Sequence, residues 1–171
     1  MTEILILYLL LNGQNTMYGI SKSMKKFFGM ITNPGFGTLQ PALRRLEKNG
    51  YIKSDKFMTD GGKPYYYCNI TDTGKEFLSS QLLEPFSDNP VKLLPAIKIR
   101  LICLDALEVS GKKELCKMIK AELLKISNFS EKALKGGYFE NNFSGKMVLD
   151  NTICEYKNLY NLVEGIEKCL Q

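Results

Sequence analysis

The stretch that decides the fold is GTLQPALRRLEKNGYI, residues 37–52. Its apolar residues recur every three or four positions, which predicts an amphipathic helix over about residues 38–49 that is closed by Gly50. The expected buried stripe consists of Leu39, Ala42, Leu43 and Leu46. At about 100° per residue, the opposite face consists of Pro41, Arg44 and Lys48, flanked by Gln40 and Arg45. This helix is therefore expected to pack on a core and to present cations outward.

Two helices are expected before this one. Residues 4–11 are apolar on nearly every side, so that helix should be buried by several neighbours. Thr16 is a suitable N-cap for a second helix over about residues 17–28. One face of this second helix is apolar, and the other carries Tyr18, Ser21, Lys22 and Lys25. Residues 29–37 are interrupted by proline and glycine, which predicts a loop.

After Gly50 the periodicity changes from helical to alternating, which predicts two strands over residues 52–57 and 64–70. The Asp-Gly-Gly sequence at residues 60–62 is a strong signal for a β-hairpin turn. In the second strand, one face is expected to carry Tyr66, Cys68 and Ile70. Thr71 can then cap a fourth helix over about residues 72–83.

The sequence Ser-Asp-Asn-Pro at residues 87–90 is the best candidate for a domain boundary, so the expected domains are residues 1–86 and 87–171. The second domain is helical in pattern. Its expected helices run from about residue 91 or 96 to 109, over about 112–133, and over about 146–170. In the last helix, apolar residues repeat at spacings of three or four along its whole length.

The chain has 171 residues and a formal net charge of +5. Residues 1–80 contain 10 Lys+Arg and 6 Asp+Glu, net +4, whereas residues 81–171 contain 13 and 12, net +1. A basic first half beside a nearly neutral second half indicates a polyanionic partner for the first half. The longest apolar run, residues 4–11, is far shorter than the about twenty residues of a membrane span. No secretory signal is evident, so a cytoplasmic protein is expected.

Histidine is absent, which excludes His-based catalytic triads and His-ligated zinc. The five cysteines form no Cys-x-x-Cys pair and fit no zinc-binding spacing. They are expected to be reduced thiols that pack as small buried hydrophobes, with thiol sensing as the alternative. No paired carboxylates or glycine-rich loop match a catalytic or nucleotide-binding motif. The chain is therefore expected to be no enzyme and to hold no metal or cofactor.

Three helices, a two-stranded hairpin and a fourth helix form the element order of a winged helix-turn-helix. The expected fold class is mainly α with a small β-hairpin wing, that is, a winged helix-turn-helix followed by an α-helical domain. In such a fold an exposed helix face can enter the major groove of DNA, while the wing approaches the phosphate backbone. Two alternatives stay open: the basic face is an ordinary solvated surface, or the fold serves as a protein-interaction adaptor without DNA binding.

Residues 37–52 resemble the recognition-helix signature of the PadR family of bacterial transcriptional regulators. Lys63-Pro64, Tyr67 and residues 70–74 are similar to that family's wing and its junction with the next helix. Residues 17–20 resemble the start of the family's second helix. The resemblance covers roughly residues 4–80. This chain departs from the usual pattern at Gln40, where the family has tyrosine, and at Cys68, where it has an aromatic residue.

The resemblance and the exposed polar positions together predict a set of DNA-contacting residues. They are Tyr18, Ser21, Lys22, Thr38, Gln40, Pro41, Arg44, Lys48 and Lys63. Arg44 is expected to read bases in the major groove, whereas Lys63 and the residues of the second helix are expected to contact phosphates.

The resemblance further implies a homodimeric, ligand-responsive repressor that binds an inverted-repeat operator and pairs through its carboxy-terminal helices. The expected dimerisation residues are Leu149, Ile153, Tyr156, Tyr160, Val163 and Ile166. As an alternative, this stripe packs wholly within its own chain. Regulators of this fold are commonly released from DNA by small aromatic molecules. The candidate lining of such an effector pocket is Tyr138, Phe139, Phe143, Tyr156 and Tyr160, although aromatic residues at helical spacing can equally be plain core.

Overall fold

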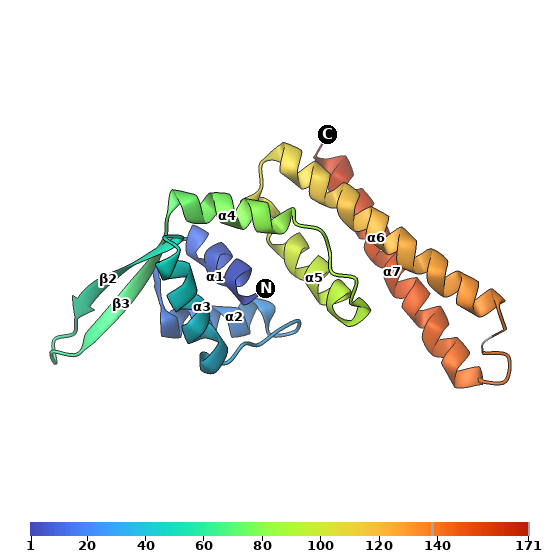
Figure 1. Ribbon diagram of the computed structural model, residues 1–171, viewed down its shortest axis with the longest axis horizontal. Coiled ribbons are helices and arrows are strands. Elements are labelled where there is room, and N and C mark those ends of the chain that lie inside the picture. Colours follow the sequence, from blue (N-terminus) through green and yellow to red (C-terminus); the bar gives the residue numbers. More distant parts are fainter. Residues whose placement is uncertain (138, 171) are drawn as a thin grey trace. The chain divides into compact units, whose positions relative to one another are not determined.

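The structure is a computed structural model that describes residues 1–137 and 139–170, without the side chain of Pro90 (Figure 1). It is mainly helical with one small antiparallel sheet, as the sequence predicts. The chain divides into two compact units, Met1–Glu108 and Val109–Gln171. Each unit is described by itself below. None of the described helices is both long enough and apolar enough to cross a membrane.

The first unit contains five helices, a three-stranded sheet and a short 3-10 turn. Its helices are α1 (Thr2–Leu11), α2 (Met17–Phe28), α3 (Phe36–Lys48), α4 (Asp72–Leu82) and α5 (Pro90–Ile102). Its strands are β1 (Asn15–Thr16), β2 (Ile52–Met58) and β3 (Pro64–Ile70), and the 3-10 turn η1 is Leu104–Ala106. The strand order is β1-β3-β2, and both pairings are antiparallel.

Helix α1 forms the centre of the first unit and contacts α2, α3, α4 and β3. Its side chains Leu5, Ile6, Leu7 and Leu10 are almost fully buried. They meet Ile20, Met24 and Phe28 of α2 and the apolar stripe of α3 in one core. The uniformly apolar sequence of α1 thus reflects burial on several sides, as expected for a helix without a polar face.

Local sequence signals account for most boundaries in this unit. The Thr16 hydroxyl accepts the Gly19 N–H at 3.1 Å and caps α2, whose bounds match the prediction. Helix α3 begins at Phe36, two residues earlier than expected, because the Gly35 carbonyl already accepts the N–H groups of Thr38 and Leu39. The α3 helix ends where Gly50 adopts a φ of 75°, as its position predicts.

The sheet contains one strand that the sequence did not predict. The first strand was expected at residue 52, but Asn15 pairs with Cys68 and Thr16 pairs with Tyr67. Strands β2 and β3 pair from Ile52↔Ile70 to Met58↔Pro64 and form the wing. Cys68 is buried on one face of the wing, and the other face carries an aromatic cluster of Phe57, Tyr65 and Tyr67.

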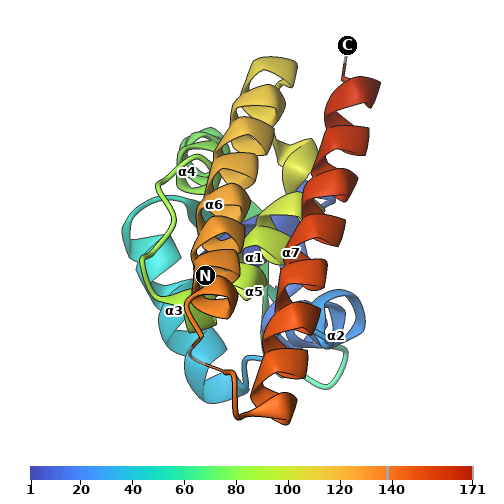
Figure 2. The ribbon, with the colours of Figure 1, turned by 90° about the vertical axis from the view of Figure 1, so that its right-hand side faces the viewer.

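The second unit is an antiparallel pair of long helices, α6 (Val109–Lys135) and α7 (Phe143–Cys169), which run side by side (Figure 2). The expectation of one helix reaching residue 109 was wrong. Helix α5 ends at Ile102, η1 follows, and α6 begins at Val109. Burial of Cys103, Leu104 and Leu107 around this turn explains the break, because the turn directs all three side chains into a core.

The compact units divide later in the chain than the predicted domain boundary at residues 86 and 87. Helix α5 belongs to the first unit because Leu93, Ile97 and Ile99 are buried there. Arg100 strengthens this attachment, since its guanidinium donates to the Glu84 carbonyl and lies over the Phe86 ring, with its Cζ atom 4.2 Å from the ring centroid. The division into functional domains at residues 86 and 87 stays a prediction.

Candidate nucleic-acid interface

Helix α3 has one buried and one exposed face. Leu39, Ala42, Leu43 and Leu46 are buried, which anchors the helix to the core. The opposite face exposes Thr38, Gln40, Pro41, Arg44 and Lys48, all five of the α3 residues predicted to contact DNA. Because proline has no N–H, Pro41 donates no intrahelical hydrogen bond to the Gly37 carbonyl.

Helix α2 contributes a second polar surface. Tyr18 is 71% exposed, Lys22 is exposed, and Ser21 is half-buried. Lys25 and Lys26 are also exposed and follow Lys22 by three and four positions, so they lie on the same side of α2. Sequence reasoning did not include these two lysines among the DNA-contacting residues, although their spacing from Lys22 carries the signal.

The wing ends in a tight turn that exposes Lys63. The Thr59 N–H donates to the Lys63 carbonyl at 3.0 Å, and the Lys63 N–H donates to the Thr59 hydroxyl at 3.0 Å. Gly62 takes a φ of 73°, a conformation that residues with a side chain rarely adopt. The backbone of the turn is thus fixed, while the Lys63 ammonium projects into solvent at the tip.

Arg45 differs from its neighbour Arg44. Its Nε donates to Glu3 Oε1 of α1 at 2.7 Å. The Arg45 side chain is 60% exposed and that of Glu3 29%, so the pair contributes little to stability. It does orient Arg45 toward α1, whereas Arg44 has no such contact with α1. The two adjacent arginines are therefore set apart by tertiary structure.

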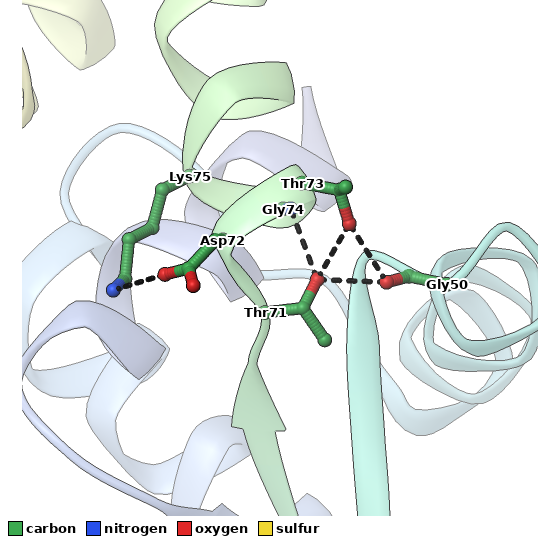
Figure 3. A network of polar contacts seen from close by, with 6 residues as sticks. All are labelled: Gly50, Thr71, Asp72, Thr73, Gly74 and Lys75. Atoms are coloured by element: carbon green, nitrogen blue, oxygen red, sulfur yellow. Dashed lines mark hydrogen bonds and ion pairs between the residues drawn. The ribbon is translucent and has the colours of Figure 1, made fainter.

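The start of α4 is tied to the end of α3 (Figure 3). Thr71 and Thr73 both donate hydroxyl hydrogens to the Gly50 carbonyl, at 2.7 Å and 3.1 Å. The Thr71 hydroxyl also accepts the Gly74 N–H at 3.0 Å, which makes Thr71 the predicted N-cap of α4. This set of contacts connects the exposed helix α3 to the rest of the first unit.

The residues predicted to form a dimer interface mostly face α6 of the same chain. Ile153, Tyr156 and Val163 are buried, and Leu149, Tyr160 and Ile166 are half-buried. Burial raises the pKa of the Tyr156 phenol above its usual value. The assignment of these six residues to a dimer interface stays a prediction. The hairpin exposes a different set of large apolar residues: Leu124, Phe129, Phe143, Met147, Val148 and Leu162.

The aromatic candidates for an effector pocket fall into two groups. Tyr156 and Tyr160 line a groove between α6 and α7 together with Leu123, Ser127 and other residues. Phe139 lies in the connection between α6 and α7, whereas Phe143 is the first residue of α7 and is 79% exposed. Tyr138 lies outside the described residues. Among the described aromatic candidates, only two of the four therefore lie together in one concave site.

Three cysteines are buried as expected, namely Cys68, Cys103 and Cys116. Burial raises the pKa of the Cys103 thiol to about 12, so this thiol is protonated at neutral pH. The expectation of burial was wrong for Cys154 and Cys169, which are exposed because they lie on the side of α7 that faces away from α6. No group of three or more potential metal ligands occurs among the described residues.

Comparisons with known proteins found one matching family and several similar solved structures. Residues 6–80 match the model of the transcriptional regulator PadR-like family. A transcriptional regulator from Clostridium thermocellum is 34% identical over 46% of this chain and 76% of that chain, with a TM-score of 0.43. A PadR family transcription regulator from hypervirulent Clostridium difficile R20291 is 30% identical over 47% and 81%, with a TM-score of 0.40. Bacillus subtilis PadR in complex with operator DNA is 21% identical over 99% and 98%, with a TM-score of 0.46. No curated protein matches this chain.

Proposed function

This chain belongs to the PadR-like family of transcriptional regulators, and on that premise we propose that it is a cytoplasmic, sequence-specific DNA-binding repressor. We propose further that it acts as a homodimer on an inverted-repeat operator. The observation that carries the proposal is the exposed face of α3, where Gln40, Arg44 and Lys48 stand opposite a fully buried stripe. A helix of this kind can lie in the major groove while its other face stays in the core.

The DNA contact proposed for each residue follows from the chemistry of its side chain. Arg44 reads a guanine, because its guanidinium can donate to two acceptors at once in the major groove. Thr38 and Gln40 lie nearer the start of α3 and contact bases or phosphates there. Lys48 and Lys63 contact phosphates as single cations, and Tyr18, Ser21 and Lys22 of α2 do the same with hydroxyls and an ammonium. Lys25 joins this set on the strength of its exposure.

The test starts from DNA that wild-type protein selects out of a random-sequence pool. The affinity is then measured against salt for the selected DNA and for a scrambled duplex. Lys63→Ala is expected to weaken both to a similar extent and to flatten the slope of log K against log salt by about 1, since one phosphate contact releases about one counterion. Lys168→Ala on α7 removes the same charge outside the proposed interface and serves as the control. Equal slopes for Lys63→Ala and wild type would remove the wing from the interface.

The homodimer is supported by a limit on what one recognition helix can read. Specific regulators need about 4–10 kcal/mol over non-specific binding, more than the few bases read by one helix supply. A two-fold dimer doubles the contacts and requires inverted half-sites about one helical turn apart. The exposed apolar side chains of the α6–α7 hairpin, such as Val148 (68% exposed) and Leu162 (54% exposed), suit such a contact.

The burial pattern determines how the dimer should be tested. A charge at Val163 would disrupt the α6–α7 contact itself, because that side chain is fully buried. Val148→Glu with Leu162→Glu instead places charges on exposed positions. We expect this variant to be a folded monomer by sedimentation velocity that no longer protects its operator. Lys168→Glu lies on a different side of α7 and should leave the dimer intact. A dimeric Val148→Glu/Leu162→Glu protein would exclude this surface.

We propose further that a small aromatic effector binds this regulator. The groove lined by Tyr156 and Tyr160 offers two phenol groups, with Leu123 and Ser127 on its α6 side. A small phenol such as 4-hydroxybenzoate is a suitable probe of this groove in calorimetric titrations. Binding by wild type that is lost in Tyr160→Ala would support the site, whereas equal binding by both proteins would place any effector elsewhere.

The adaptor alternative makes a different prediction for the same protein. A winged helix that binds only proteins would show no preference for any duplex and no salt-dependent affinity in the physiological range. Selection from random DNA would then return no enriched sequence. Three exposed cations, Lys22 on α2, Arg44 on α3 and Lys63 at the wing tip, favour DNA over this alternative, because all three can bind phosphates.

A further inference from the structure

Two threonine hydroxyls meet on one backbone carbonyl at the end of the proposed recognition helix (Figure 3). Thr71 Oγ1 lies 2.7 Å from the Gly50 carbonyl oxygen, and Thr73 Oγ1 lies 3.1 Å from it. The two hydroxyl oxygens are 2.9 Å apart. Either hydroxyl can be the donor between them, and each also lies within hydrogen-bond distance of the Gly50 carbonyl. A carbonyl oxygen has two lone pairs, so both donors can be accommodated.

The accepting carbonyl belongs to the residue at which the chain leaves α3. The N–H groups of Asn49, Gly50 and Tyr51 donate back to the carbonyls of α3, which closes the helix. The left-handed conformation of Gly50 turns the chain from α3 toward β2. The direction of the Gly50 carbonyl is therefore coupled to the orientation of the end of the recognition helix.

The next residue, Tyr51, is held by α4 in three further ways. The Thr71 N–H donates to the Tyr51 carbonyl at 3.0 Å. The Tyr51 ring stacks on Phe77 of α4 with ring centroids 4.1 Å apart and an interplanar angle of 7°. Gly74 approaches so closely that a Cβ atom there would lie 2.1 Å from the Tyr51 carbonyl oxygen. Both residues at the exit from α3 are thus fixed by the first turns of α4.

The wing starts at the same place, because β2 begins at Ile52, directly after Tyr51. The last residue of β3, Ile70, precedes Thr71 and pairs with Ile52. The end of the recognition helix, both strands of the wing and the start of α4 therefore converge within residues 49–52 and 70–74. Sequence-specific binding requires the helix and the wing to meet one duplex at the same time.

We propose that the Thr71 and Thr73 hydroxyls are positioning groups that set the orientation of the recognition helix relative to the wing. This inference rests on the proposed DNA binding and assigns two residues that need not touch DNA. Asp72, between them, has a different role: its side chain is 92% exposed and pairs with Lys75, one turn along α4, at 2.8 Å.

The test compares variants that remove or retain a hydroxyl without changing any charge. Thr73→Val keeps the shape of the side chain and removes one bond to Gly50. Thr71→Val removes the stronger bond and the cap of α4, and Thr71→Ser retains both. Asp72→Glu, which keeps the charge, is the control within the same turn. Each protein is measured on DNA selected by wild type and on a scrambled duplex, with a thermal melt on the same sample.

We expect Thr71→Val to weaken operator binding about tenfold or more, as for a lost base contact, and Thr73→Val to have a smaller effect in the same direction. Binding to scrambled DNA and its salt slope should not change, because the phosphate-binding charges are intact. Thr71→Ser and Asp72→Glu should behave as wild type. A lower ratio of specific to non-specific affinity in a folded protein is a result that a general loss of structure cannot produce.

Several outcomes would overturn the inference. Suppose that both Thr71→Val and Thr73→Val are folded and keep the wild-type ratio of specific to non-specific affinity. The hydroxyls then do not position the helix. If Thr71→Val is unfolded, an unchanged ratio in Thr73→Val decides against the inference. Parallel loss of specific and non-specific binding would make the role purely structural. If wild type prefers no sequence, the proposed function fails and this inference fails with it.

Discussion

The winged-helix region from α1 to α4 buries its apolar side chains around a central helix, whereas the α6–α7 hairpin buries only one face of each helix. In the first region, α1 is surrounded by α2, α3, α4 and β3. In the second, Ile153 and Val163 are covered while Val148 and Leu162 remain exposed. The same apolar periodicity therefore accompanies a fully covered helix in the first region and a helix pair with exposed apolar side chains in the second.

The largest expected effect separates the two faces of α7. Ile153→Ala should lower the free energy of unfolding by about 2–5 kcal/mol, because it leaves a cavity in the α6–α7 contact. Leu162→Ala should cost about 0.5 kcal/mol or less in a monomer. Chemical denaturation at two protein concentrations checks both. A large, concentration-dependent cost for Leu162→Ala would show that a second copy covers this face.

The next effect concerns the two adjacent arginines of α3. Arg44→Ala should weaken operator binding by about 1–3 kcal/mol, the value of one bidentate arginine–guanine contact, and leave the melting temperature unchanged. Arg45→Ala should weaken it less, since Arg45 is engaged with Glu3. Fluorescence anisotropy with labelled operator measures both variants. Equal losses for Arg44→Ala and Arg45→Ala would contradict the separation that the structure shows.

Two glycines sharpen the contrast in packing. Gly74→Ala should destabilise the protein by about 1–3 kcal/mol, because the new Cβ atom would lie 2.1 Å from the Tyr51 carbonyl oxygen. Gly165→Ala in α7 meets nothing within 4 Å and should stabilise the helix by about 0.5–1 kcal/mol. Thermal unfolding gives both signs. A stabilising Gly74→Ala would mean that the backbone at Tyr51 can move away from Gly74 at little cost in free energy.

The smallest effect is a pattern of thiol labelling rather than a change in stability. Cys154 and Cys169 should react rapidly with N-ethylmaleimide in the native protein, because both are exposed. The thiols of Cys68 and Cys103 in the first unit should react only after unfolding, and burial raises the pKa of both. Mass spectrometry after timed quenching counts the labels. Fast native labelling of Cys103 would show that the first core opens readily.

Local signals were sufficient for much of the first unit. Thr16 and Thr71 cap α2 and α4 as predicted, because a cap depends on residues within three positions. The Asp-Gly-Gly turn places the two wing strands correctly for the same reason. The exposed side chains of α3 also follow from its sequence, since one residue advances about 100° around a helix.

The errors share a different cause. Strand β1 is two residues long and exists only because Asn15 and Thr16 pair with a strand more than fifty positions away. The break after Ile102 depends on where Cys103 and Leu104 find a core. The exposure of Cys154 depends on which side of α7 is covered by α6. A pattern within the chain does not contain these long-range contacts.

The sequence by itself determined that α3 has one apolar and one basic face, because periodicity and charge are properties of the residues in order. It also determined the caps and the hairpin turn, whose hydrogen bonds form between near neighbours. Only the tertiary structure decided that the Gly50 carbonyl is held by Thr71 and Thr73, and that Arg45 pairs with Glu3 while Arg44 does not. Contacts of this kind join residues that are distant in the chain, so they depend on where folding places each backbone segment.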